Sequence, residues 1–229
     1  LTINTDGSWS FDPTNDAYNN LAAGETKLIT VNYQVEDSGN LTDTNSFQIT
    51  LNGTNDTPEA TYTTAQSVAE DAAKISGQLT SLDPDSNAID ASGNPTASYK
   101  LIGAPIDGLS IDADGSWEFD PTHASYQTLT NGEVLELTVN YSVTDADGAS
   151  DQAAFVITLT GTNDAPTLTG IQSSLPGGSE DNPYSITKNQ LLAGFSDADK
   201  GEINSLDVTD LVATDDGGNQ AGTFELNST

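Results

Sequence analysis

Apolar residues occupy every second position along four stretches of the chain, 29–35, 47–51, 135–143 and 155–159, and most of the residues between them are polar. A period of two turns one face of a strand toward a core and the other toward water. Turns rich in Gly, Asp and Asn separate these stretches at short spacing, which is typical of sandwiches built from antiparallel strands. The pattern therefore predicts an all-β protein.

The chain repeats itself at an offset of 108 residues. Residues 1–60 align without a gap with residues 109–168, and 30 of the 60 positions are identical. A repeat of about 100 residues has the size of a domain rather than of a solenoid unit. The chain also begins inside an apolar pattern, so we expect a piece of a longer polypeptide. The expected units are the C-terminal part of one domain, a complete domain and the start of a further, distinct domain, in residues 1–58, 59–166 and 167–229.

The expected boundaries carry almost the same six residues. Gly53–Pro58 reads Gly-Thr-Asn-Asp-Thr-Pro, and Gly161–Pro166 reads Gly-Thr-Asn-Asp-Ala-Pro. Gly, Asn, Asp and Pro interrupt regular structure, so each copy is interpreted as a short linker between two β units. We refer to these linkers and the acidic residues expected beside them as the first and the second junction.

Large aromatic residues and short polar turns recur with the repeat. We expect the aromatic residues to fill the cores, with an exposed sugar-stacking platform as the alternative; they are Trp9, Phe11, Trp117 and Phe119. Asp followed by Pro is a helix-start signal, so Asp12 and Asp120 are each predicted to open about one helical turn. In the third unit, residues 188–192 are predicted to form another such turn before Gly194.

The composition narrows the possible partners. The chain has 35 acidic residues against 5 lysines, for a net charge of −30. Such a polyanion repels phosphate backbones and anionic lipids, so nucleic acid and membrane surfaces are poor partners and cations are favoured. The absence of cysteine excludes disulfides and thiolate metal sites. No apolar run reaches the roughly 20 residues that span a bilayer.

The acidic residues recur in a fixed order, and they carry the strongest functional signal. In chain order the features are Glu70-Asp71, Asp83-Pro84-Asp85, Asp120, Asp145-Ala146-Asp147, Asn163-Asp164, Glu180-Asp181 and Asp197-Ala198-Asp199. Calcium takes six to eight oxygen ligands, and Asp-x-Asp in a turn lets two carboxylates converge on one ion. The alternative is that these are solvated turn residues. Because grouped carboxylates repel one another without a cation, the recurring set favours calcium over plain turns, and over magnesium with its tight octahedron.

At these residues the chain resembles the VCBS repeat, a cadherin-like module of large bacterial RTX-type surface adhesins. The segments that carry the resemblance are Val68–Asp71, Ile75–Leu79, Leu82–Asp85, Asp114–Trp117 and Gly161–Pro166. Residues 167–229 resemble another cadherin-like module of the same proteins. The resemblance implies tandem Greek-key cadherin/Ig-like β-sandwiches joined end to end, calcium at the junctions, type I secretion to the bacterial cell surface, and a role as an extender between cell and target.

The resemblance to cadherins also implies which residues bind the metal. The first junction would use Asp12, Asn55, Asp56, Asp83, Asp85 and Asp145. The second would use Glu70, Asp120, Asn163, Asp164, Asp197 and Asp199, and the recurring acids Asp147 and Glu180 complete the candidate set. The first linker Asp of cadherins is Gly53 or Gly161 here, so we expect fewer ions per junction.

Other chemistry has little support. The only histidine, His123, is replaced by Asn15 in the other copy, and no partner for a general base lies near it. Acids that repeat at domain ends also differ from the single carboxylate pair of a glycosidase. We therefore expect no enzyme, but a calcium-stiffened extender of an adhesin that mediates cell adhesion or biofilm attachment. The alternative is a module of the same kind of adhesin that binds a cell-surface carbohydrate or protein.

Overall fold

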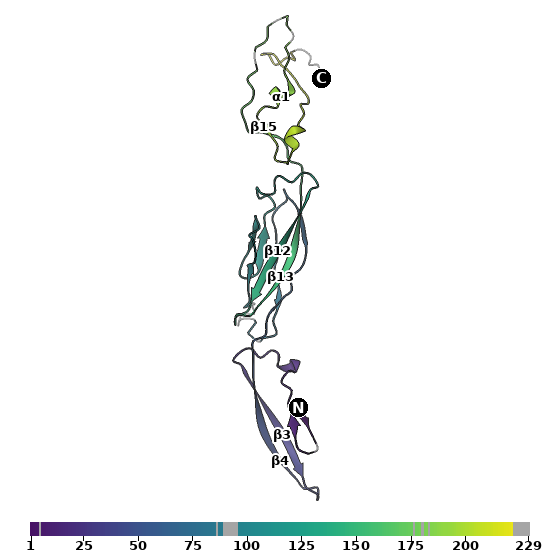
Figure 1. Ribbon diagram of the computed structural model, residues 1–229, viewed down its shortest axis with the longest axis vertical. Helices are drawn as coiled ribbons and strands as arrows, with labels where there is room; N and C mark the ends of the chain where they lie inside the picture. The colour runs from purple at the N-terminus through teal and green to yellow at the C-terminus, as the bar shows by residue number, and fades with distance from the viewer. Residues whose placement is uncertain are drawn as a thin grey trace. The chain divides into compact units, whose positions relative to one another are not determined.

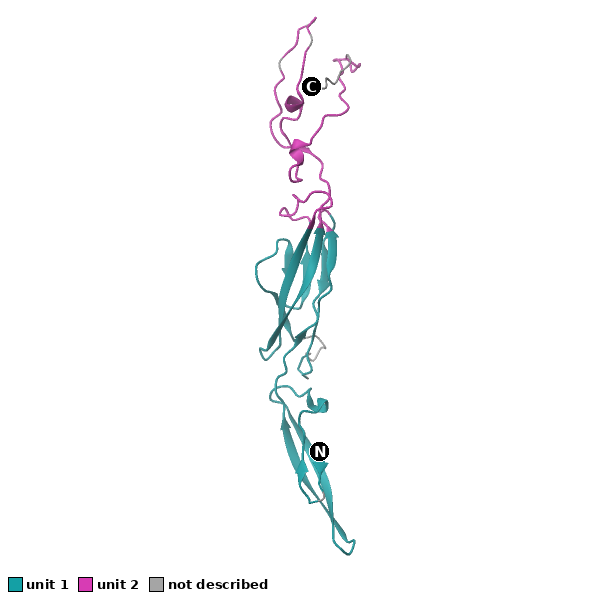
Figure 2. Ribbon diagram, turned by 45° about the vertical axis from the view of Figure 1, so that its right-hand side comes forward, with its two compact units in different colours: residues 1–68, 72–121, 135–159 teal, residues 69–71, 122–134, 160–229 magenta. Residues whose placement is uncertain are grey.

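The computed structural model describes residues 1–4, 6–85, 87–88, 96–175, 177–179, 181–182 and 184–221, and it is nearly all β (Figure 1). The chain divides into two compact units (Figure 2). The first comprises residues 1–68, 72–121 and 135–159, and the second comprises residues 69–71, 122–134 and 160–229. In the part of the chain that the structure describes, no helix has the length and apolar character needed to cross a membrane.

The strands described between residues 59 and 160 form a sandwich. They are β5 (Glu59–Ala60), β6 (Gln66–Ala69), β7 (Ile75–Gln78), β8 (Ser81–Leu82), β9 (Ser98–Leu101), β10 (Leu109–Ile111), β11 (Ser116–Phe119), β12 (Val134–Thr144) and β13 (Ser150–Thr160). One sheet has the order β6-β13-β12-β9, a second has the order β10-β11-β7, and β5 pairs with β8. Neighbours in a sheet are often distant in the chain, as in a Greek key. The prediction of an all-β sandwich is confirmed.

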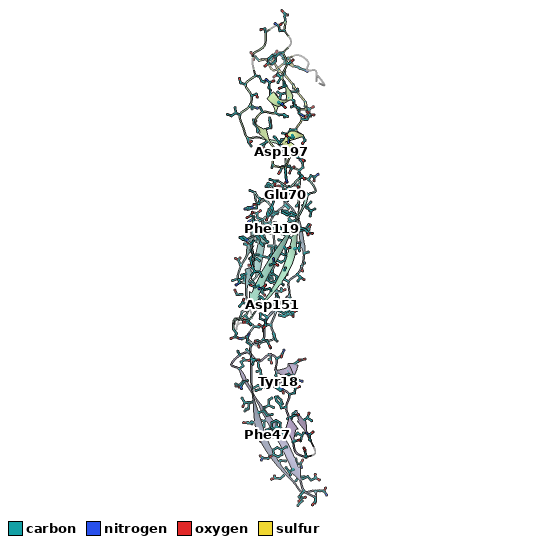
Figure 3. The ribbon with its side chains drawn as sticks, viewed as in Figure 1. Tyr18, Phe47, Glu70, Phe119, Asp151 and Asp197 are labelled. Atoms are coloured by element: carbon teal, nitrogen blue, oxygen red, sulfur yellow. The ribbon has the colours of Figure 1, made fainter. Side chains whose placement is uncertain are left out.

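The core lies between these two sheets. The ring of Trp117 on β11 lies 5.2 Å from that of Phe155 on β13, centroid to centroid. Phe119, Tyr141 and Ile157 are fully buried beside them, and Phe119 is labelled in Figure 3. Every second residue of β13 from Phe155 to Leu159 is buried, as the alternating pattern predicts.

Residues 1–58 form two pairs of strands. β1 (Thr2–Ile3) pairs with β2 (Trp9–Ser10), and the longer β3 (Thr26–Glu36) pairs with β4 (Thr42–Asn52), both antiparallel. Trp117 and Phe119 are buried as predicted, but the core position predicted for Trp9 is wrong, because 48% of this side chain is exposed. The strand that covers Trp117 is β7, and residues 1–58 repeat only the part of the domain that follows β7.

The predicted helical turns are only partly correct. In the first repeat a 3-10 helix, η1 (Asp16–Tyr18), is capped by Asn15 rather than opened by Asp12. Oδ1 of Asp12 accepts hydrogen bonds from the backbone N–H of Thr14 at 2.9 Å and from its hydroxyl at 2.7 Å, so it closes its own turn instead. The corresponding residues 121–128 form turns without a helix.

The third unit contains the predicted helical turn. It is α1 (Lys188–Leu191), which Thr187 and Gln190 stabilise at its start with a capping box. This segment also holds β14 (Thr167–Leu168), which pairs with β15 (Phe195–Ser196), and a 3-10 helix, η2 (Glu202–Asn204).

Candidate metal centres

The glycine at the start of each linker fixes where the chain passes. Gly53 N donates to the carbonyl oxygen of Glu25 at 2.9 Å, and Gly161 N donates to that of Glu133 at 2.8 Å. A Cβ atom at Gly161 would lie 2.2 Å from the backbone oxygen of Thr130, and Gly53 is equally crowded. The resemblance to cadherins suggested a lost metal ligand at these positions. The structure gives a steric reason for glycine, because no side chain fits against this backbone.

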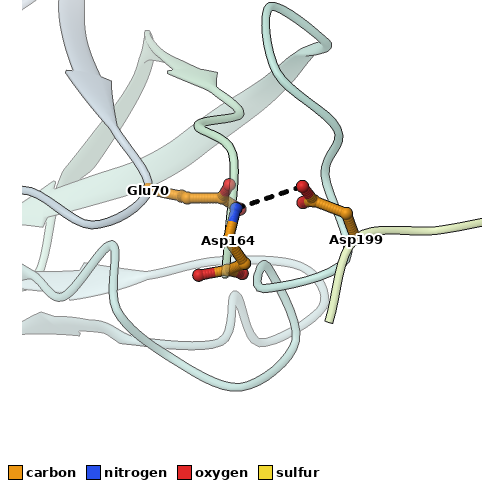
Figure 4. A group of neighbouring side chains, drawn as sticks. All are labelled: Glu70, Asp164 and Asp199. Atoms are coloured by element: carbon orange, nitrogen blue, oxygen red, sulfur yellow. Dashed lines mark hydrogen bonds between the residues drawn. The ribbon is translucent and has the colours of Figure 1, made fainter. Parts of the chain in front are cut away.

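At the second junction three carboxylates lie together. Glu70, Asp164 and Asp199 each place one oxygen within 4.8 Å of the others (Figure 4). Glu70 directly follows β6, Asp164 lies in the linker, and Asp199 follows β15. Glu70 is fully buried, and Asp199 is 2% exposed. Backbone hydrogen bonds position them, since Thr162 N donates to Oε1 of Glu70 at 2.7 Å and Asp164 N donates to Oδ2 of Asp199 at 3.1 Å.

The other oxygens of these carboxylates are buried without a protein partner among the described residues. They are Oε2 of Glu70, Oδ2 of Asp164 and Oδ1 of Asp199. Burial raises the pKa of Glu70 and also that of Asp164, and the neighbouring acids Asp71 and Asp199 raise both further. Among the described residues, no ion pair joins a lysine to these carboxylates. Unpaired buried charge is unfavourable, so the donor set fits a hard divalent cation that supplies the missing charge.

A second group shares a residue with the first. Oxygens of Asp197, Asp199 and Glu202 lie within 4.8 Å of one another, and Asp197 is labelled in Figure 3. Asp199 N donates to Oδ1 of Asp197 at 3.1 Å. Gly201, with φ 87°, turns the chain so that Glu202 returns toward the Asp-x-Asp pair. Sequence reasoning missed Glu202, although its place directly after Asp-x-Asp-x-Gly was a usable signal.

The first junction repeats part of this geometry. Asp56 N donates to Oδ2 of Asp85 at 2.8 Å, and Nδ2 of Asn55 donates to Oδ2 of Asp145 at 2.9 Å. Asp85 is 5% exposed, and its Oδ1 is buried without a partner in the described part of the chain. Burial raises the pKa of Asp85, and the charge of Asp83 adds to this. Asp83 accepts from Asp85 N at 3.0 Å.

Two further residues complete the first junction. Asp147 N donates to Oδ1 of Asp145 at 2.9 Å, and Oδ2 of Asp147 accepts from Nδ2 of Asn87 at 2.9 Å. Asn87 was missed although it lies only two residues after Asp85 of an Asp-x-Asp pair. The two groups of three carboxylates found among the described residues both lie at the second junction.

The remaining predicted ligands that the structure describes make contacts outside the two groups of carboxylates. Asp12 is bonded within its own turn, and Oδ2 of Asp120 lies 3.7 Å from Nζ of Lys74. Nδ2 of Asn163 donates to the backbone oxygen of Asp164 at 2.8 Å. Glu180 lies outside the described residues. Asp71 was not among the predicted ligands, and its Oδ2 accepts from the hydroxyl of Thr162 at 2.6 Å.

Two family models match the chain. Residues 55–158 match a bacterial Ig domain, and residues 162–227 match a cadherin-like domain. No curated protein matches. The chain thus contains Ig-like and cadherin-like β-sandwich domains in tandem, which are domains that typically mediate adhesion or extension at the cell surface.

Solved structures of cadherins are similar to this chain at low sequence identity. For mouse cadherin-23 EC22-24 the identity is 16% and the TM-score 0.40, with 61% of this chain and 43% of that chain covered. For protocadherin gamma B2 domains 1–5 the identity is 16% and the TM-score 0.44, with 88% of this chain and 38% of that chain covered. For protocadherin gamma B7 domains 1–4 the identity is 19% and the TM-score 0.41, with 88% of this chain and 48% of that chain covered. The chain spans less than half the length of each.

Proposed function

We propose that this chain is an extender segment of a bacterial surface adhesin that calcium stiffens at its two junctions. One observation carries the proposal. At both junctions the second Asp of an Asp-x-Asp pair accepts a linker N–H on one oxygen, and its other oxygen is buried with no partner among the described residues; these residues are Asp85 and Asp199. A buried carboxylate oxygen in this position is a natural ligand for a cation.

Calcium suits the donor set better than other metals. All the candidate ligands are oxygens, and no histidine or cysteine lies among them. Calcium accepts such sets with flexible geometry, whereas magnesium retains its waters. When bound, the ion would neutralise the carboxylates of Glu70, Asp164 and Asp199 at the second junction and those of Asp85, Asp145 and Asp147 at the first. Sites with Kd of about 10⁻⁴–10⁻³ M suffice in extracellular fluid.

The domain boundaries and the route to the surface are part of the same proposal. We place the units at residues 1–58, 59–166 and 167–229, with the ligands of each junction drawn from both sides of a linker. The resemblance to the VCBS repeat supports export by a type I system to the bacterial surface. There the segment would hold a binding region at a distance from the cell.

Small-angle scattering of the full chain tests the stiffening. With calcium at about 5 mM, above the weak-site range, we expect one narrow distribution of interatomic distances. With EDTA we expect a broader one. The matched control is the double variant Asp85→Asn/Asp199→Asn, which keeps both hydrogen-bond acceptors and should give the broad distribution in both buffers. Identical curves for the unchanged protein with and without calcium would contradict the proposal.

A further inference from the structure

The loop that follows β15 brings three acidic residues together within residues 197–202. Asp197, Asp199 and Glu202 each place one carboxylate oxygen within 4.8 Å of the others. Asp199 N donates to Oδ1 of Asp197 at 3.1 Å, and Glu202 N donates to the carbonyl oxygen of Asp199 at 3.2 Å. We call these three residues the loop group, and we call Glu70, Asp164 and Asp199 the junction group.

Asp199 belongs to both groups, and its two oxygens have different surroundings. Oδ2 accepts the backbone N–H of Asp164 at 3.1 Å (Figure 4). Oδ1 is buried and has no hydrogen-bond partner among the described residues. The same holds for Oδ1 of Asp85 in the complete domain, so the unused oxygen is a property of this kind of loop. An ionised carboxylate has about four acceptor sites, so Asp199 can bind one cation in each group.

The charge of the two groups favours more than one cation. Together they contain five carboxylates, of which a single divalent ion would neutralise two. The lysine of the loop, Lys200, forms no ion pair in the described part of the chain, and its backbone N–H donates to the carbonyl oxygen of Thr128 at 3.2 Å. Carboxylates this close repel one another unless cations lie between them. A second ion would remove most of the remaining repulsion.

Glu202 distinguishes this loop from its counterpart in the complete domain. Counted from the second Asp of the Asp-x-Asp pair, Ala88 occupies the position of Glu202. Ala88 N donates to the carbonyl oxygen of Asp85 at 3.0 Å, which is the bond that Glu202 N makes to Asp199. The two loops thus share this backbone bond, but only the loop of the third unit has a carboxylate at this position.

We propose that the loop group binds a calcium ion of its own, so that the second junction holds two ions and Glu202 is a ligand of the one in the loop. The inference rests on the proposed calcium binding at the junctions. Backbone oxygens and water would complete the six to eight ligands of this ion. Because its side-chain ligands all come from residues 197–202, it would stay bound when Asp164 moves away. It would also fix Asp199, which receives the linker N–H.

Two variants of the full chain separate the two ions. Glu202→Gln removes a ligand of the loop group alone, and Glu70→Gln removes a ligand of the junction group alone. Calcium titrations are followed by NMR at the amides of Gly201 and Asp164. For Glu202→Gln we expect the Kd at Gly201 to rise by at least about tenfold, because losing even an outer-shell partner costs a metal site that much. The signal of Asp164 should still shift and saturate. Glu70→Gln should have the reverse effect.

The matched control is Asp207→Asn, which removes an acid of the same unit whose side chain is 74% exposed. It should change neither titration. An equal rise of Kd at Gly201 and Asp164 in both variants would indicate one shared ion and overturn the proposal. An unchanged response of Gly201 in Glu202→Gln would also overturn it. In both cases shifts of Asp56 and Asp164 in the unchanged protein would leave the proposed function standing. If calcium shifts none of these signals in the unchanged protein, the proposed function fails as well.

Discussion

The backbone N–H of Asp56 donates to Oδ2 of Asp85 over 2.8 Å, and the same bond joins Asp164 to Asp199 over 3.1 Å. The linker residues are 164 − 56 = 108 positions apart, but the acceptors are 199 − 85 = 114 apart. The third unit thus reproduces the bond although its spacing departs from the repeat. The geometry belongs to the junction rather than to one type of domain.

Replacing the buried carboxylate of Asp199 should raise stability in EDTA and reduce the stabilisation that calcium gives. Asp199→Asn keeps an acceptor for Asp164 N but removes a charge from a group of buried acids. In EDTA we expect a higher melting temperature than that of the unchanged protein. In calcium we expect the variant to gain less, because one ligand is lost. For the unchanged protein at ten times Kd, mass action gives about 1.4 kcal/mol per site.

Asp207→Asn is the matched control for Asp199→Asn. Asp207 lies in the same unit, and its side chain is 74% exposed beside Lys188. Its replacement should shift the melting temperature equally in calcium and in EDTA. If Asp199→Asn behaved in the same way, Asp199 would not be a metal ligand.

Glu70→Gln should affect the second junction alone. Glu70 accepts from Thr162 N at 2.7 Å, and its Oε2 is buried without a protein partner among the described residues. The glutamine carbonyl can keep the bond, but its amide nitrogen cannot bind a cation. In a calcium titration followed by NMR, we expect the amide signal of Asp164 to stop responding while that of Asp56 still shifts. A response lost at both residues would contradict two separate sites, and a response lost at neither would contradict Glu70 as a metal ligand.

Asp151 should stabilise the fold only above acidic pH. Its Oδ2 accepts from Ala60 N at 2.9 Å, and backbone hydrogen bonds from Ala60 and Gln152 lower the pKa of Asp151, which is labelled in Figure 3. A lowered pKa in the folded state gives stability that is present above the unfolded value of about 3.9 and is lost as pH falls through the folded pKa. Melting in EDTA should show Asp151→Asn less stable near neutral pH, with the difference disappearing as pH falls through the lowered pKa of the folded state. A difference that persists there would rule out this origin.

Gly161→Ala should destabilise the protein whether or not calcium is bound. The added Cβ would meet the backbone oxygen of Thr130 at 2.2 Å, and backbone atoms cannot rotate away. Overpacking of this kind costs about 1–3 kcal/mol. Urea titration in both buffers measures the loss, and Gly177→Ala, with open space around it, is the control. A loss confined to calcium would instead indicate a direct effect on the metal site.

The sequence predicted the long strands because their alternation is unbroken. The stretches 29–35 and 135–143 lie inside β3 and β12, whose ends extend only a few residues further. Burial could not be predicted in the same way. Trp9 and Trp117 stand in identical Asp-Gly-Ser-Trp segments, yet only one is covered, because the covering strand comes from far away in the chain.

The candidate sites were predictable in part because their motifs recur in the sequence. Asp-x-Asp pairs and the Asn-Asp linker recur in the sequence, and Asp85 and Asp199 indeed receive the linker N–H bonds. Glu202 and Asn87 were missed because their approach depends on how a single loop folds back. Asp12 fitted the family pattern, but the hydroxyl and N–H of the nearby Thr14 bind its carboxylate locally.

Calorimetric titration of the chelated full chain with calcium tests the central claim most directly. Saturable heat with Kd of about 10⁻⁴–10⁻³ M is expected from the unchanged protein. The folded double variant Asp85→Asn/Asp199→Asn should give none in that range. No saturable heat from the unchanged protein, or equal heat from both, would contradict calcium binding at these junctions.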